Sequence, residues 1–290
     1  MTIADNLQTI IDCKADMKAA IEEKGVTISG GLSTYADAIR EIEQNGDIII
    51  NKLEIPANTK FGYSNWEEPL AIDTSEYTDM SNMFFACMNL KTAPNMETSN
   101  VTDMHQMFWN CKITSIPLYN TSKVTNMEAM LRFTKIKSLP LLDTSNVTTM
   151  EAFVGNTPIT SFPRLNTSKV TIMKEMFNGC NLLTDVPLLD LSNTWRTYLM
   201  FQGCYNLANV EGFKDFGKAL SLDTTGMFDM CTSLTRQSCI NIFNNLYDRA
   251  SAGYDYDAKL TFPKAVVNRL SEDDIAIATV KGWTLYYSEY

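Results

Sequence analysis

The chain has 290 residues, 45% of them hydrophobic, and a formal net charge of −10 at pH 7. This acidic balance excludes nucleic acid and anionic membranes as partners, because both require clustered lysine and arginine. No apolar run approaches the roughly 18 residues that span a bilayer, so membrane insertion is not expected either.

Residues 1–45 are predicted to form a separate helical module that ends its first helix at Gly25 and begins its second at Ser33 or Thr34. Apolar side chains of the first helix alternate three and four residues apart. The candidate anchoring or oligomerisation residues are Leu7, Ile10, Met17 and Ile21. Two interpretations remain open. The helix packs on its neighbour within the chain, or it joins copies of the protein and attaches them to a larger assembly.

Within this module, residues 14–26 followed by residues 32–42 resemble the N-terminal modules of fibre and appendage proteins of gut bacteriophages. The resemblance implies a virion component that contacts other virion proteins through residues 1–45. The start of the chain, residues 1–6, shows neither a basic nor an apolar segment of a secretory signal. We therefore expect that a signal has been removed, or that the protein reaches the exterior by another route such as a released virus particle.

Residues 46–70 are predicted to cap a repeat region, with strands at Asp47–Ile50 and Lys52–Ile55. A cap is needed because the terminal repeat would otherwise expose its core.

Residues 71–234 repeat with a period of 23 or 24 residues, seen in three ladders that keep one register. The threonine ladder is Thr74, Thr98, Thr121, Thr144 and Thr167. The methionine ladder is Met80, Met104, Met127, Met150 and Met173. The proline ladder is Pro94, Pro117, Pro140, Pro163 and Pro187. A period of this length predicts a solenoid of stacked coils.

One copy, residues 121–143, predicts the content of each coil. Thr125 and Glu128 have the spacing of a capping box, and the apolar residues that follow favour a helix of about two turns. Residues 136–141 then favour a short strand that ends near Pro140. The predicted fold class is an α/β solenoid whose coils each contain a short strand and a short helix.

The strings at residues 142–150 and 176–182 resemble the BspA-like (bacterial surface protein) type of leucine-rich repeat. The resemblance covers residues 71–234. It implies a leucine-rich-repeat-like solenoid that serves as a scaffold for adhesion or binding.

Methionine and cysteine recur at fixed positions of the coils. The methionines have helical spacing and are interpreted as core residues, in preference to an adaptable binding surface. Cys87, Cys111 and Cys180 occupy a slot that holds Thr134 and Thr157 in other coils. A slot that accepts either residue indicates a small, semi-polar core position and not a required disulfide or metal ligand.

Residues 235–290 lose the period and are predicted to form an α+β C-terminal cap. The pattern predicts a helix at residues 238–247, a strand at 259–262, a helix that begins at Ser271 and a closing strand at 283–286.

No nucleophile elbow, phosphate-binding loop or positioned carboxylate pair is present, so no enzymatic activity and no cofactor are expected. A single histidine and the lack of Cys-x-x-Cys argue against a metal site. The candidate binding residues lie on the solvent side of the repeats, Lys137 at a strand position and the other three around the predicted helices. They are Trp109, Arg132, Lys137 and Tyr205. Ordinary exposed or partly covered residues are the alternative interpretation.

These observations predict a non-enzymatic phage structural or appendage protein located on the virion. Its solenoid is expected to bind a protein or polysaccharide of a host cell or mucosal surface. One alternative is a bacterial cell-surface adhesin, and another is a purely architectural virion component. Homo-oligomerisation through residues 1–45 stays open.

Overall fold

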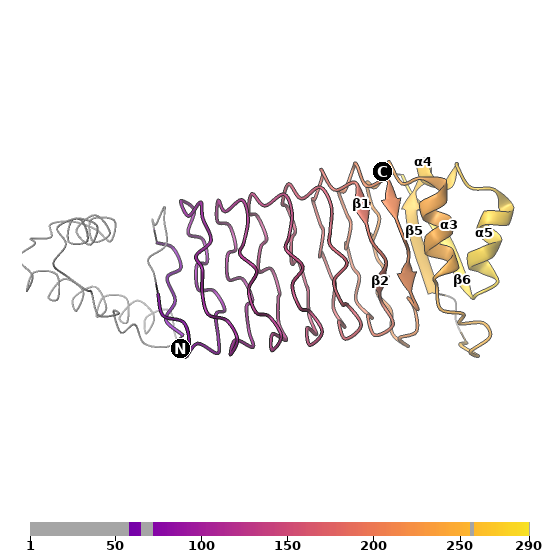
Figure 1. Cartoon of the computed structure of the whole chain (residues 1–290). Helices are drawn as coiled ribbons and strands as arrows, with labels where there is room; N and C mark the ends of the chain where they lie inside the picture. The colour runs from indigo at the N-terminus through magenta and orange to yellow at the C-terminus, as the bar shows by residue number, and fades with distance from the viewer. Residues whose placement is uncertain (1–57, 65–71, 256–257, 290) are drawn as a thin grey trace, which may run out of the picture.

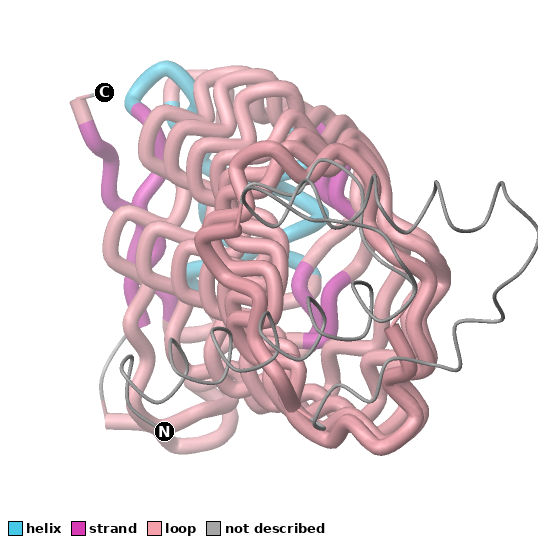
Figure 2. Tube along the Cα trace, turned by 90° about the vertical axis from the view of Figure 1, so that its left-hand side faces the viewer, coloured by secondary structure: helices cyan, strands magenta, loops and turns pink. Residues whose placement is uncertain are grey.

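The computed structural model describes residues 58–64, 72–255 and 258–289. Over these residues the chain runs as a stack of similar coils that ends in a small unit of helices and strands (Figure 1). Viewed nearly along the stack, successive coils superimpose on one another (Figure 2). The predicted repeat fold is confirmed. The helical module at residues 1–45, with its anchoring residues, and most of the cap at 46–70 lie outside the described residues and stay predictions.

Neighbouring coils are joined by a parallel ladder that advances one coil at each step. The bridged residues are Asp79, Asp103, Asn126, Thr149, Ile172, Arg196 and Asp223. Regular strands appear only toward the C-terminal coils of the described region. There β1 (Asp185–Val186) pairs in parallel with β3 (Asn209–Val210), and β2 (Leu189–Asp190) pairs in parallel with β4 (Phe213–Lys214).

The short helix predicted for every coil is wrong, because the described coils turn there without forming one. The amide of Met127 donates to the carbonyl of Thr149 in the next coil (3.1 Å), and the amide of Met130 donates to the carbonyl of Met127 (3.3 Å). An α-helix would use the carbonyl four residues back instead. Ala129, between them, has a positive φ of 49°, which a right-handed helix excludes. The three-residue spacing of apolar side chains therefore comes from consecutive tight turns.

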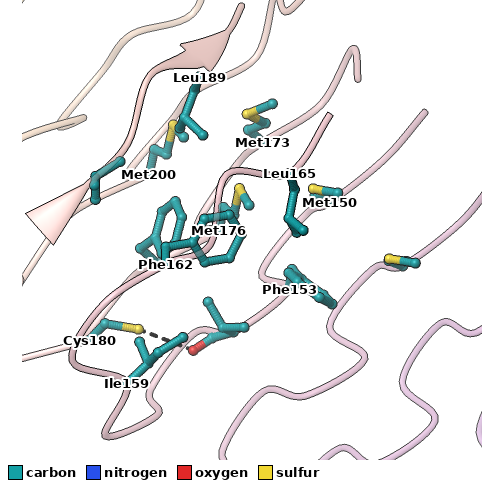
Figure 3. Close-up of a cluster of buried hydrophobic side chains, with 14 of the residues drawn as sticks. Met150, Phe153, Ile159, Phe162, Leu165, Met173, Met176, Cys180, Leu189 and Met200 are labelled. Atoms are coloured by element: carbon teal, nitrogen blue, oxygen red, sulfur yellow. Dashed lines mark hydrogen bonds between the residues drawn. The ribbon is translucent and has the colours of Figure 1, made fainter. Parts of the chain in front are cut away.

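The methionines of the repeat are core residues, as predicted, and the side chains of neighbouring coils share one interior (Figure 3). Phenylalanines at equivalent positions stack on each other. The rings of Phe84 and Phe108 lie 5.4 Å apart at 2°, and those of Phe177 and Phe201 lie 5.0 Å apart at 4°. Full burial of each such side chain contributes about 1.5–3 kcal/mol.

The hydroxyls of the threonine ladder are buried, and each one is satisfied because it donates a hydrogen bond to a backbone carbonyl of the next coil. Thr121 donates to the carbonyl of Asp143 (2.7 Å) and Thr144 to that of Asn166 (2.7 Å). A buried hydroxyl without a partner would be costly. The repeated threonine is thus a hydrogen-bonding device between coils.

The slot that alternates between cysteine and threonine is a semi-polar core position, as predicted. Cys180 donates to the carbonyl of Val154 (3.1 Å), and Thr134 donates to the carbonyl of Leu131 (2.7 Å). All cysteines among the described residues are free and buried. Burial raises the pKa of the Cys180 thiol above its ordinary value, which makes it a poor nucleophile.

The C-terminal unit follows the predicted order of elements. It comprises α3 (Arg236–Asn244), β5 (Ala258–Pro263), α4 (Lys264–Val267), α5 (Glu272–Thr279) and β6 (Trp283–Ser288). The sequence missed only the single turn α4. β5 and β6 pair in parallel, and the ring of Phe228 in the last coil stacks on Phe262 of β5 at 4.7 Å. The unit therefore continues the core of the coils and covers its end.

None of the helices in the described part of the chain has the length and apolar character required to cross a membrane.

Candidate recognition surface

Four aromatic side chains form a continuous row across successive coils, called here the aromatic ridge: Tyr63, Phe85, Trp109 and Phe133. Phe85 and Trp109 stack with ring centroids 4.6 Å apart and an angle of 4°. Tyr63 meets Phe85 edge to face at 5.3 Å, and Phe133 meets Trp109 edge to face at 5.5 Å. The side chains of Tyr63 and Phe133 are 77% and 37% exposed. The ridge is an apolar surface on the outside of the stack, separate from the core.

The backbone under the ridge takes a conformation that large side chains rarely adopt. Tyr63 and Phe133 have φ values of 62° and 63°. Other coils place Ala86, Asn156, Gly179 and Met230 at the same repeat position, and these residues also have positive φ. The conformation therefore belongs to the turn of every coil, whichever residue occupies it. An aromatic residue there carries strain of roughly 1–2 kcal/mol compared with glycine.

Arg132 connects the aromatic ridge to a charged cluster in the next coils. Its guanidinium lies 5.1 Å from the ring centroid of Phe133, and its Nη2 donates to Oε2 of Glu175 at 2.8 Å. The Nε of Arg132 is buried and has no partner among the described residues. Lys174 completes the cluster through Oε1 of Glu151 at 2.7 Å. The hydrogen bond with Glu151 raises the pKa of Lys174, so Lys174 stays charged at neutral pH.

The structure brings two of the predicted binding residues together and places the other two elsewhere. Trp109 and Arg132 both contact Phe133. Lys137 is exposed in another row, where its carbonyl accepts a hydrogen bond from the amide of Thr160 (3.1 Å). Tyr205 lies in a later coil, is 50% exposed and donates to the sulfur of Met230 (3.4 Å). A binding role for any of the four stays a prediction.

Sequence reasoning missed three members of the aromatic ridge. Phe85 precedes Trp109 by one period, and this shared position was a signal that the sequence contained. Phe133 was hidden because it follows Arg132 at a position where other coils carry small or polar residues. Tyr63 lies before the first ladder residue, so no repeat register could place it.

No group of three or more histidine, cysteine, aspartate or glutamate side chains suited to a metal ion occurs in the described segments. The aromatic ridge and the charged cluster beside it offer aromatic rings, one guanidinium and paired charges. These groups suit non-covalent binding.

The family described as Mycoplasma protein of unknown function, DUF285, matches residues 58–158 and, in a second overlapping match, residues 132–243. Together the two matches cover more than half of the chain. The chain belongs to this family. Overlapping matches are what a periodic sequence produces, because the same model fits in more than one register.

No curated protein matches the chain. Among solved structures, a leucine-rich repeat protein from Bacteroides ovatus ATCC 8483 aligns with 12% identity over 79% of this chain and 80% of that chain. The TM-score of 0.18 means that this likeness carries no structural argument. Neither comparison supports a virion protein, and the segment that resembles phage modules lies outside the described residues.

Proposed function

We propose that this protein is a non-enzymatic recognition protein of a bacterial cell surface and that its aromatic ridge binds a protein partner. The BspA-like character of the repeats and membership of the DUF285 family support a repeat scaffold. The cell-surface location is favoured over the virion by the BspA-like resemblance, because the comparisons contain nothing that points to a virus particle.

The packing of the aromatic rings is the reason for proposing a protein partner. Phe85 and Trp109 lie parallel at 4.6 Å, so each ring covers one face of the other. A sugar that stacks on an aromatic side chain needs an open face, and this pair leaves at most one face on each ring. Ring edges are positively polarised and suit carbonyl groups, carboxylates and the faces of other aromatic rings. A protein surface supplies all three.

The composition of the ridge agrees with a protein interface. Tryptophan, tyrosine and arginine dominate the residues that carry binding energy in such interfaces. Tyr63, Trp109 and Arg132 place all three types on one side of the stack.

The location is tested by quantitative mass spectrometry of bacterial envelope fractions and purified phage particles. Enrichment in the envelope is expected. Enrichment in particles at a fixed copy number, with none in the envelope, would overturn the cell-surface proposal in favour of the virion hypothesis.

Binding is tested with the fluorescently labelled full chain on intact host epithelial cells. Trp109→Ala should weaken binding about tenfold or more, because truncating a central aromatic residue commonly costs 2 kcal/mol or more. Gln202→Ala is the matched control, since Gln202 occupies the same repeat position in a later coil. Treatment of the cells with protease should abolish binding. Loss on glycosidase treatment alone would overturn the choice of a protein and indicate a polysaccharide.

The same variants also test whether the aromatic ridge binds a second copy of the chain. If Trp109→Ala changed the sedimentation of the protein from dimer to monomer and left cell binding intact, the ridge would be a homo-oligomer contact and the proposal would fail.

A further inference from the structure

The strand β6 is the outer strand of the two-stranded sheet in the C-terminal unit. β5 lies against the last coil, where the hydroxyl of Thr224 donates to the carbonyl of Lys259 at 2.6 Å, and β6 lies on the far side of β5 (Figure 1). Among the described residues no further strand pairs with β6. A free strand edge presents a row of unpaired amides and carbonyls with which another chain can pair.

The register between β5 and β6 shows which backbone groups form this edge. The amide of Ala258 donates to the carbonyl of Gly282 at 3.1 Å, and Ala258 lies opposite Trp283. In a parallel pair the backbone groups of alternate residues face the partner strand. The amides and carbonyls of Leu285 and Tyr287 therefore point away from β5, and within the described part of the chain they form no backbone hydrogen bond.

β6 lacks the features that usually protect an exposed strand edge. Residues 283–288 contain no proline and no charged side chain, and their pairing with β5 continues without a bulge. Tyr286 and Tyr287 are instead 45% and 57% exposed. Leu285 is on the same face of the strand as the buried Trp283 but is itself only partly buried. A partner on this edge would therefore cover apolar side chains as well as backbone groups.

The sequence of β6 is complementary to a second copy of itself. In an antiparallel pair centred on Tyr286, the Tyr286 side chains of the two copies lie opposite each other, Leu285 lies opposite Tyr287, and Thr284 lies opposite Ser288. Because Leu285 and Tyr287 carry the outward backbone groups, each of these pairs can exchange both of its hydrogen bonds. Aromatic and apolar pairs of this kind stabilise a sheet, and no like charges meet within residues 284–288.

We propose that β6 pairs antiparallel with β6 of a second copy, so that two chains form a dimer through the C-terminal ends of their stacks. The two-fold axis is perpendicular to a continuous sheet of order β5–β6–β6–β5. This contact is closed by its symmetry, so it covers the unprotected edge without leading to open-ended association. The aromatic ridge belongs to the early coils at the opposite end of the stack, so each chain of the dimer keeps its ridge accessible (Figure 1).

Sedimentation velocity of the full chain at micromolar to submillimolar concentrations tests the dimer. Wild type should change from monomer to dimer as its concentration rises. Tyr286→Lys and Tyr286→Glu should each weaken the dimer about tenfold or more, because each places two like charges opposite each other at the two-fold axis. An equal mixture of the two variants should dimerise again, because opposite charges then meet. This recovery requires that position 286 of one chain lies opposite position 286 of the other.

Tyr205→Lys is the matched control, since Tyr205 is a similarly exposed tyrosine in a coil outside the C-terminal unit, and it should leave the dimer unchanged. Circular dichroism checks that the variants are folded. Hydrogen exchange of the wild type requires no variant: the amides of Leu285 and Tyr287 should exchange more slowly as protein concentration rises. The proposal is overturned if wild type stays monomeric, if both Tyr286 variants dimerise as wild type does, if the mixture of folded variants stays monomeric, or if exchange of these two amides does not depend on concentration.

Discussion

One row of outward positions changes its chemistry along the stack while the backbone beneath it stays the same. In the early coils this row holds Phe85 and Trp109, which stack at 4.6 Å. In the later coils it holds Asn178 and Gln202, joined by a hydrogen bond from Nδ2 to Oε1 of 3.0 Å, and it ends at Asp229. The contact between neighbouring coils at this row is thus aromatic stacking in the early coils and a hydrogen bond between side chains in the later ones.

This contrast shows which residues hold the fold and which are free to differ. The inward phenylalanines stack alike in both halves, at 5.4 Å for Phe84 and Phe108 and 5.0 Å for Phe177 and Phe201. Because the inward residues and the hydrogen bonds between coils maintain the backbone, the outward row can carry aromatic side chains at one end and polar side chains at the other.

The largest expected effect tests whether the two halves share one kind of interior. Phe108→Ala and Phe177→Ala should each lower the free energy of unfolding by about 3–5 kcal/mol, since both rings are fully buried and leave a cavity. Urea unfolding followed by circular dichroism measures both. A loss below about 1 kcal/mol for either would show that the two interiors are not equivalent.

A smaller loss is expected when an inward threonine loses its hydrogen bond. Thr144→Val should lower the free energy of unfolding by about 0.5–1.5 kcal/mol, because the buried hydroxyl of Thr144 loses its 2.7 Å hydrogen bond to the carbonyl of Asn166. Thr148→Val is the control, since Thr148 is exposed, and its effect should stay within about 0.5 kcal/mol. Equal effects of the two variants would contradict the role given to the buried ladder.

The ion pair between Arg132 and Glu175, beside the aromatic ridge, should contribute less to the free energy of unfolding than the buried phenylalanines do. Arg132→Met should cost about 1 kcal/mol, because the pair with Glu175 is only partly buried and methionine retains much of the packing. Arg164→Met removes the pair with Glu211, whose side chains are 60% and 56% exposed, and should change the unfolding free energy by almost nothing. Thermal unfolding at low and high salt distinguishes the two, since the exposed pair is screened more.

The smallest effect concerns pH and is confined to the early coils. Nδ1 of His105 lies 2.9 Å from Oδ1 of Asp103, and this hydrogen bond raises the pKa of His105 above 6.5. Its contribution is thus fully present below about pH 6.5 and lost as pH rises through the raised pKa. We expect a few tenths of a kcal/mol, as for other exposed pairs.

His105 is the only histidine in the chain, so an NMR titration of its ring reports this pKa directly. Asp103→Asn should lower it. An unchanged value would mean that the hydrogen bond with Asp103 does not set the pKa. The comparable pair in the later coils, Lys174 with Glu151, should not titrate near neutral pH, because the pKa of Lys174 is raised from 10.5.

A candidate site residue could be predicted from the sequence only where it stands out at a regular repeat position. Trp109 could be singled out in the sequence because it is an aromatic residue outside the core positions, and Arg132 because it interrupts the pattern of the same row. The aromatic ridge as a whole could not, since Phe133 belongs to the next position and Tyr63 precedes the ladders.

The period, the inward residues and the order of elements after residue 235 follow from the sequence, because each depends on residue type at regular or local spacing. The conformation of the coils does not. In a helix the amide of Leu131 would bond to the carbonyl of Met127, yet it bonds to the carbonyl of Phe153 in the next coil at 3.0 Å. Local spacing of apolar residues is the same for a helix and for consecutive tight turns. The stacking of whole coils supplies hydrogen-bond partners about one period away, and it is this long-range pairing that selects the turns.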